Sequence, residues 1–313
     1  MGISTGLLAA AFVAVAIVVA LMFTVRRARS FSSAPDAYPA LAQLRRNARL
    51  ARLVGLALTA GVLWLTGAIG GDRWLATAPV IIGLILIGSV IAGERASYRA
   101  AQQPGEAAIE RRNVSDYVPK WLAVASLVGI VLLVGALIVG AIMAGPDGRS
   151  VEWGCTVDTP DGPTSVGGSG SPFPGAFYGP LVAAAVVVLI GAAVVALWMV
   201  AARPRNGADP ALVTLDDALR RQTAEGILAA VLLAISATML GIGAFGASAV
   251  SNIGRVDAGY VLPDGTFFQV PDCPAEPLVS FAKLLFPAVA WLGLVGTLVG
   301  FGSLLWPRAV VRR

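Results

Sequence analysis

The sequence predicts an all-α integral membrane protein, a seven-helix bundle with a small disulfide-tied β-hairpin cap on its outer face. Three observations predict this fold class. Hydrophobic residues make up 57% of the chain and charged residues only 13%, whereas soluble domains carry about 25% charged residues. Seven apolar segments approach or exceed the roughly 20 residues that cross a bilayer as a helix. The two cysteines lie in two long polar loops between these segments.

The seven predicted spans form one transmembrane domain over residues 1–313. The first apolar run is not preceded by basic residues and is followed by Arg26 and Arg27. This order predicts an uncleaved anchor and not a signal peptide. The spans cover approximately residues 4–25, 53–71, 75–93, 121–144, 179–202, 226–250 and 279–305.

The basic residues predict the orientation. Of the 23 lysines and arginines, 19 lie in segments on one side of the predicted spans, and four lie on the other side: Arg73, Arg149, Arg255 and Lys283. The positive-inside rule makes the arginine-rich side cytoplasmic. We therefore expect a multi-pass plasma-membrane protein with its N-terminus outside and its C-terminus inside. Its arginine-rich loops are expected to contact anionic lipids, and we expect no nucleic-acid partner.

A repeat is suggested by two segments at a constant offset of 171 residues. "PALAQLRRNARLARLVG" begins at Pro39 and "PALVTLDDALRRQTAEG" at Pro210. Both read as short amphipathic helices that enter the next span. They suggest a parallel duplication with a 3+1+3 plan, although sequences rich in Ala, Leu and Gly also match by chance. The plan is similar in topology to SWEET sugar transporters, and this similarity implies no residue roles.

The composition excludes several kinds of chemistry. The chain has no histidine, which removes histidine acid–base catalysis and histidine-bound metals. Two cysteines cannot build a four-cysteine zinc or iron–sulfur site. We therefore predict a protein that is not an enzyme and has no cofactor, no metal and no catalytic residues.

Three ionisable residues in or beside the spans are functional candidates. Glu94 lies at the cytoplasmic end of the third span and Glu225 at the start of the sixth, where charged side chains usually reach water. Lys283 lies in the seventh span, where microbial rhodopsins carry a retinal lysine. It is near the outer end, however, and no span offers an acidic counter-ion. A snorkelling lysine is the favoured interpretation.

The outer loops 145–178 and 251–278 each predict a β-hairpin. "YVL" and "TFFQV" flank a Pro-Asp-Gly turn, and "VEWGCTV" precedes "DTPDGPTSV". β-prone runs around such turns are typical of hairpins. "GGSGSPFPG" then predicts a flexible linker. We expect the two loops to form one cap, tied by a disulfide between Cys155 and Cys273. The alternative, a redox-active thiol pair, lacks a CxxC motif.

The segments "GERASYRAAQQPGEAAIERRNVSDYVPKW" and "SGSPFPGAFYGP" resemble uncharacterised multi-pass membrane proteins of high-GC actinobacteria. The entries to the fourth and fifth spans carry most of this resemblance. It implies a multi-pass fold and no activity.

Two functions remain open from the sequence. The first is a non-enzymatic structural, assembly or sensory membrane protein with a protein partner. The second is a small-molecule transporter whose substrate path lies between the two three-helix units. The Gly-rich spans, including Gly296 and Gly300, are compatible with both, since small residues allow close helix packing.

Overall fold

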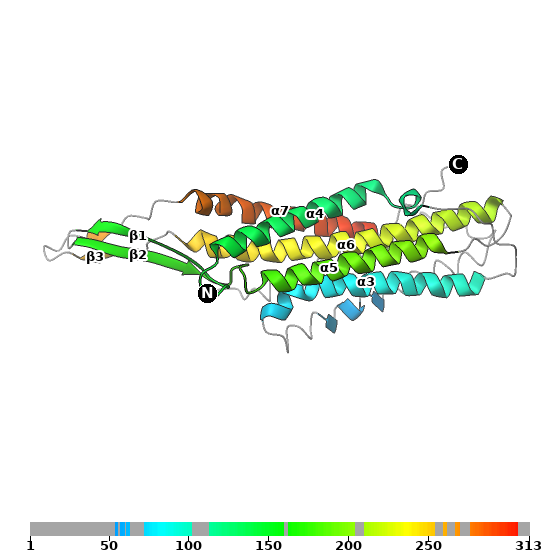
Figure 1. Ribbon diagram of the computed structural model, residues 1–313, viewed down its shortest axis with the longest axis horizontal. Helices are drawn as coiled ribbons and strands as arrows, with labels where there is room; N and C mark the ends of the chain where they lie inside the picture. The colour runs from blue at the N-terminus through cyan, green and yellow to red at the C-terminus, as the bar shows by residue number, and fades with distance from the viewer. Residues whose placement is uncertain are drawn as a thin grey trace.

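The computed structural model describes residues 54–55, 57–59, 61–62, 72–101, 113–159, 162–203, 210–253, 259–261, 267–269 and 276–305. Five long α-helices lie side by side along their lengths (Figure 1). They are α3 (Asp72–Ala101), α4 (Lys120–Met143), α5 (Gly179–Ala202), α6 (Pro210–Asn252) and α7 (Pro277–Leu305), with a short 3-10 helix η2 (Val114–Asp116) before α4.

Consecutive helices run in alternating directions (Figure 1). The segments after α4 and α6 therefore emerge at one end of the bundle, and those after α3 and α5 at the other. We call the first the hairpin end, because both hairpins lie there. We call the second the arginine end, because Arg95, Arg203 and Arg220 lie there. The predicted loops thus fall on the same two sides that the charge pattern separated.

The prediction of a seven-helix bundle with a tied cap is wrong in that form. The described residues contain five helices that are long and apolar enough to cross a membrane. These five coincide with the last five predicted spans. The first predicted span, 4–25, lies outside the described residues, and in the second, 53–71, only residues 54–55, 57–59 and 61–62 are described, as helix. Hydropathy shows only that a segment is apolar enough to cross a bilayer, and it does not show how the segments assemble.

The α6 helix is the centre of the bundle. It contacts α3, α4, α5 and α7. In its most apolar stretch 78% is buried, compared with 22–39% for the other four membrane-length helices. Its 43 residues form one continuous helix of about 65 Å. The predicted amphipathic segment from Pro210 and the span 226–250 are therefore a single element, since no proline or glycine interrupts residues 211–225.

The α6 and α7 helices approach each other at glycines. A β-carbon built on Gly293 would lie 2.5 Å from the backbone nitrogen of Leu240, and one on Gly300 would lie 2.8 Å from that of Leu233. No real side chain fits at these distances. The absence of a side chain at these two positions lets the two backbones pack together.

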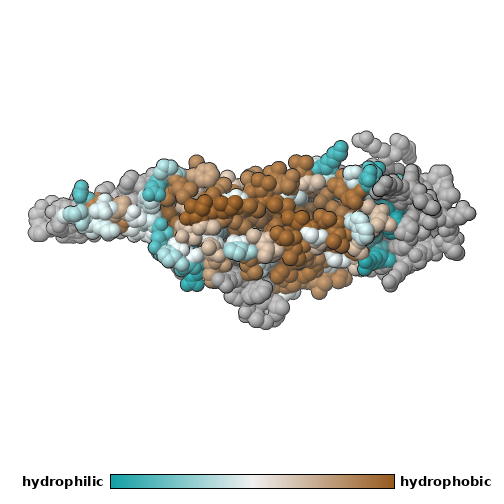
Figure 2. All heavy atoms as spheres, in the orientation of Figure 1, coloured by the Kyte–Doolittle hydropathy of each residue, from teal (hydrophilic) through white to brown (hydrophobic). Residues whose placement is uncertain are grey.

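The face of the helices in Figure 2 carries a broad apolar band, with hydrophilic residues towards both ends. Large hydrophobic side chains that a soluble protein would bury are exposed here. Examples on α4, α5 and α7 are Leu127, Val131, Ile142, Val187, Val194, Leu284 and Trp291. Such a surface fits the hydrocarbon core of a bilayer, and the protein is a membrane protein by this criterion.

Both predicted hairpins are present. In the first, β1 (Val151–Thr159) pairs antiparallel with β2 (Gly162–Gly170), and in the second, β3 (Gly259–Val261) pairs with β4 (Phe267–Gln269). They form two separate two-stranded sheets and not one sheet. Residues 167–170 of the predicted flexible linker belong instead to strand β2. A Gly-rich segment can pair in this way because the hydrogen bonds between strands are made by backbone groups.

Cys155 lies on β1 opposite Val166 and is not a free thiol. Cys273 lies outside the described residues. The described structure therefore contains one cysteine, and the expected tie between the two hairpins is not part of it. Residues 39–53 of the segment from Pro39 also lie outside the described residues, so the duplication stays a prediction.

A hydrogen-bonded turn fixes the base of the first hairpin. The Asp147 carboxylate accepts from the Ser150 hydroxyl at 2.7 Å and from the backbone N–H groups of Ser150 at 2.8 Å and Arg149 at 3.0 Å. Gly148 adopts a φ of 68°, a conformation that favours glycine. The Ser150 hydroxyl bond, followed by the two backbone bonds, lowers the pKa of Asp147.

Candidate functional site: a buried arginine network

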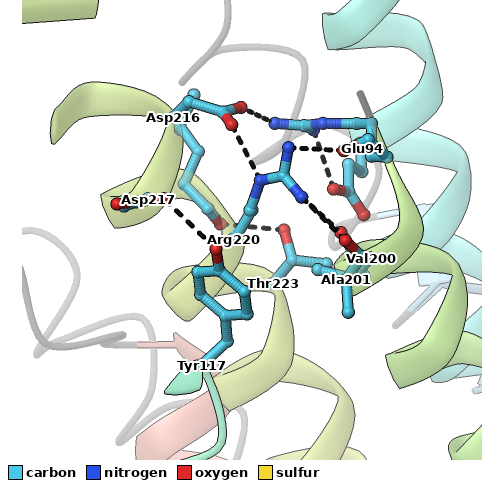
Figure 3. Close-up of polar contacts among 10 residues, drawn as sticks. Glu94, Tyr117, Val200, Ala201, Asp216, Asp217, Arg220 and Thr223 are labelled. Atoms are coloured by element: carbon cyan, nitrogen blue, oxygen red, sulfur yellow. Dashed lines mark hydrogen bonds and ion pairs between the residues drawn. The ribbon is translucent and has the colours of Figure 1, made fainter. Parts of the chain in front are cut away.

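A fully buried arginine lies at the arginine end of the bundle. Arg220, on α6, has 0% of its surface exposed. Its Nε donates to a carboxylate oxygen of Asp216 at 2.7 Å, one helical turn earlier on the same helix. An unpaired charge at this depth would be strongly unfavourable. The surrounding acceptors therefore determine whether the side chain can be buried (Figure 3).

Those acceptors are the last carbonyl groups of α5. Arg220 Nη1 donates to the carbonyl oxygens of Val200 at 3.0 Å and Ala201 at 3.1 Å, and Nη2 donates to that of Arg203 at 2.8 Å. Carbonyls in the final turn of a helix have no partner within the helix. They also carry the negative end of the helix dipole. Arg220 donates hydrogen bonds to these carbonyls and places a positive charge at the negative end of the dipole. A side chain of α6 therefore caps the C-terminus of α5.

A second arginine joins α3 to the same cluster. Arg203 follows the last residue of α5, and its Nη1 donates to the Glu94 carboxylate at 2.8 Å. Its Nη2 donates to Asp216. The Asp216 carboxylate therefore binds both guanidinium groups. The side chains of Arg203, Glu94 and Asp216 are only 12–16% exposed, so water screens these ion pairs less than surface pairs.

Tyr117 brings a fourth element to the network. It follows η2 just before α4, and its hydroxyl donates to Asp217 at 3.3 Å. The guanidinium carbon of Arg220 lies 5.7 Å from the centre of the Tyr117 ring, within the range of a cation–π interaction. Thr223 donates to the Leu219 carbonyl oxygen within α6. Figure 3 shows these groups converging from different helices.

No known protein family, curated protein or solved structure matches the chain. The resemblance to actinobacterial membrane proteins therefore stays a prediction from the sequence.

The network joins the ends of several helices by hydrogen bonds and ion pairs. The contacts described above connect α3, α5, α6 and Tyr117, which lies just before α4, at one end of the bundle. Each guanidinium is bound to carboxylates, backbone carbonyls or both, an arrangement suited to holding helix ends. Within the described ranges, no three or more acidic or cysteine side chains form a group that could hold a metal ion.

The three candidates from the sequence lie in different places. Glu94 is part of the network, bound to Arg203. Glu225 is buried in α6, little more than one turn beyond Arg220. Lys283 is exposed in the second turn of α7, towards the hairpin end. The structure therefore does not unite them in one site.

Sequence reasoning missed Arg220, Arg203, Asp216 and Tyr117. Arg203 served only as a topology signal, and Arg220 served as a topology signal and as one position of the suggested repeat. Asp216 and Arg220 stand four residues apart, a spacing that pairs charges on a helix. This spacing could have indicated the local ion pair, but not the contact with α5.

Proposed function

We propose that this chain is a non-enzymatic membrane protein that serves a structural, assembly or sensory role in the plasma membrane. In this proposal the arginine end faces the cytoplasm and the hairpins face outward. The observation that carries this proposal is that the buried arginines bind helix ends and other side chains of the same chain. Arg203 and Arg220 join helix ends to one another, while nine-residue strands extend the chain beyond the opposite end.

The packing of the described helices gives the transport alternative less support. The α6 and α7 backbones meet at Gly293 and Gly300. One groove between helices lies at the edge of the arginine end, between α3 and α5. A substrate path would instead call for a polar cavity at the middle of the spans.

Orientation can be tested by labelling single cysteines. In a chain carrying Cys155→Ser and Cys273→Ser, the exposed positions Ser165 on β2 and Ser115 in η2 receive Ser165→Cys or Ser115→Cys. A membrane-impermeant maleimide should label Ser165→Cys in intact cells and Ser115→Cys only after permeabilisation. The reverse pattern would contradict the proposed orientation.

The partner role can be tested by site-specific photocrosslinking in native membranes. A photoreactive residue replaces exposed Thr156 on the hairpin or, as a matched control, Val131, which is 63% exposed in the apolar band. We expect a discrete protein adduct from position 156 and lipid adducts from position 131. Solute uptake into proteoliposomes, with no protein adduct at position 156, would favour transport.

A further inference from the structure

A groove lies between α3 and α5 at the arginine end. It encloses about 290 Å³. Its apolar lining comes from Ile91 on α3 and from Trp198, Met199 and Ala202 on α5. These side chains offer an apolar trough large enough for part of a hydrocarbon chain.

The position of the groove matches the boundary of a bilayer. The membrane-length stretches of the two helices end at Arg95 and Ala202, and both of these residues line the groove. Trp198 stands one turn before the end of α5 and is 64% exposed. Tryptophan is enriched at this depth because its ring is apolar and its N–H can reach polar headgroups. The groove therefore spans the level at which acyl chains meet headgroups.

The charged lining favours an anion. It consists of Glu94, Arg95 and Arg203, which together carry a net charge of +1. Glu94 and Arg203 bind each other, whereas Arg95 is exposed at the rim. A guanidinium at this level suits a phosphate group, which it can bind through two parallel hydrogen bonds.

We propose that this groove binds one anionic phospholipid, with an acyl chain against Trp198 and Met199 and the headgroup phosphate at Arg95. The proposal rests on the membrane embedding alone and not on a protein partner. An anionic lipid is favoured over a zwitterionic one because the lining has an excess positive charge.

Quenching of Trp198 fluorescence by brominated lipid tests the proposal. The purified full-length chain is reconstituted in phosphatidylcholine vesicles that contain a small fraction of brominated phosphatidylglycerol or brominated phosphatidylcholine. The chain has seven tryptophans, so the Trp198 signal is the difference between the unmodified chain and Trp198→Phe. We expect brominated phosphatidylglycerol to quench it at a roughly fivefold lower fraction, the preference that one basic side chain gives near a membrane surface.

Three variants separate a specific site from general surface attraction, each compared with its own Trp198→Phe partner. Arg95→Gln should abolish the preference for the anionic lipid. Arg221→Gln removes an exposed arginine on α6 that does not line the groove, and it should keep the preference. Ala202→Phe fills the trough and should weaken quenching by both lipids.

Several results would overturn the proposal. Equal quenching by the two brominated lipids would exclude an anion-selective site. An equal loss of preference in Arg95→Gln and Arg221→Gln would show attraction to the surface as a whole. A Trp198 that neither lipid quenches would show that something other than lipid covers the groove. None of these outcomes depends on the crosslinking result at position 156.

Discussion

Arg220 on α6 donates a hydrogen bond to the carbonyl oxygen of Val200 on α5, with a nitrogen-to-oxygen distance of 3.0 Å. The two residues are 20 positions apart in sequence. This bond connects a fully buried side chain to a helix end that would otherwise lack a partner. Because both ends of the contact lie in a water-poor region, replacing Arg220 should cost more than replacing an arginine at the surface.

Replacing Arg220 by methionine should strongly destabilise the folded protein. The substitution leaves the Asp216 carboxylate without one partner and the last α5 carbonyls without donors. Breaking a buried ion pair in this way costs about 3–5 kcal/mol. Unfolding in mixed micelles of increasing denaturing-detergent content would measure the loss. The matched variant Arg221→Met changes the adjacent exposed residue and should alter stability little. Equal effects of the two variants would show that the contacts of Arg220 are not stabilising.

Glu94 and Arg203 should be energetically coupled. They connect α3 with the end of α5 across 2.8 Å, and both side chains are largely buried. In a double-mutant cycle with Glu94→Gln and Arg203→Gln, we expect a coupling free energy of about 1–3 kcal/mol in unfolding experiments. A parallel cycle of Glu94→Gln with Arg221→Gln should be additive. Additivity in the first cycle would mean that the ion pair does not hold the two helices together.

A methyl group at Gly293 should separate α6 from α7. Its β-carbon would lie 2.5 Å from the Leu240 nitrogen, so Gly293→Ala requires the backbones to move apart. Overpacking of this kind typically costs about 1–3 kcal/mol. Gly302→Ala provides the control on the same helix, because a β-carbon there meets nothing within 4 Å. It should be neutral or slightly stabilising, since alanine favours helix. Thermal denaturation in detergent distinguishes the two variants.

The turn at the base of the first hairpin should loosen only in strong acid. Hydrogen bonds from the Ser150 hydroxyl and two backbone N–H groups lower the pKa of Asp147. A lowered pKa means that the carboxylate stabilises the turn above its unfolded value of about 3.9. This stabilisation is lost as the pH falls through the lower folded value.

An NMR titration of the Asp147 side-chain carboxyl carbon should therefore show a midpoint below the ordinary aspartate value. Asp147→Asn should remove the matching pH dependence of the Ser150 amide shift. A midpoint at or above the ordinary value would show that these hydrogen bonds do not favour the charged form.

Local features of the fold were predictable from local sequence patterns. The apolar lengths of 75–93, 121–144 and 179–202 correspond to α3, α4 and α5 because a helix in lipid must satisfy its backbone within its own segment. The Pro-Asp-Gly turn of residues 263–265 likewise predicts the pairing of β3 with β4. These signals need no knowledge of what lies next to each element.

The centre of the bundle was not predictable in the same way. The apolar stretches of α4 and α5 are more hydrophobic than that of α6, yet α6 is the most buried. In a membrane, apolar side chains are equally compatible with lipid and with protein, so hydropathy does not distinguish the two. Burial of α6 depends on its small residues and on its partners, which only the packing reveals.

The arginine network was also not predictable from the sequence, for a related reason. Counting basic residues by side treats Arg220 as a charge in water, whereas it is buried against the end of α5. The acceptors that permit this burial are backbone carbonyls, which every residue carries and no sequence motif marks. Glu94 was singled out by its position, but its partner Arg203 follows 109 residues later.

The continuity of α6 has a mechanical consequence. Near one end, the Ala249 backbone is in close contact with Gly170 of β2, and 29 residues earlier Arg220 is locked to α5. The helix between them is continuous and contains no proline, and this stretch is about 44 Å long. One helix therefore carries both contacts, so a shift of α6 along its axis would move its contact with the first hairpin and its contact with the end of α5 together.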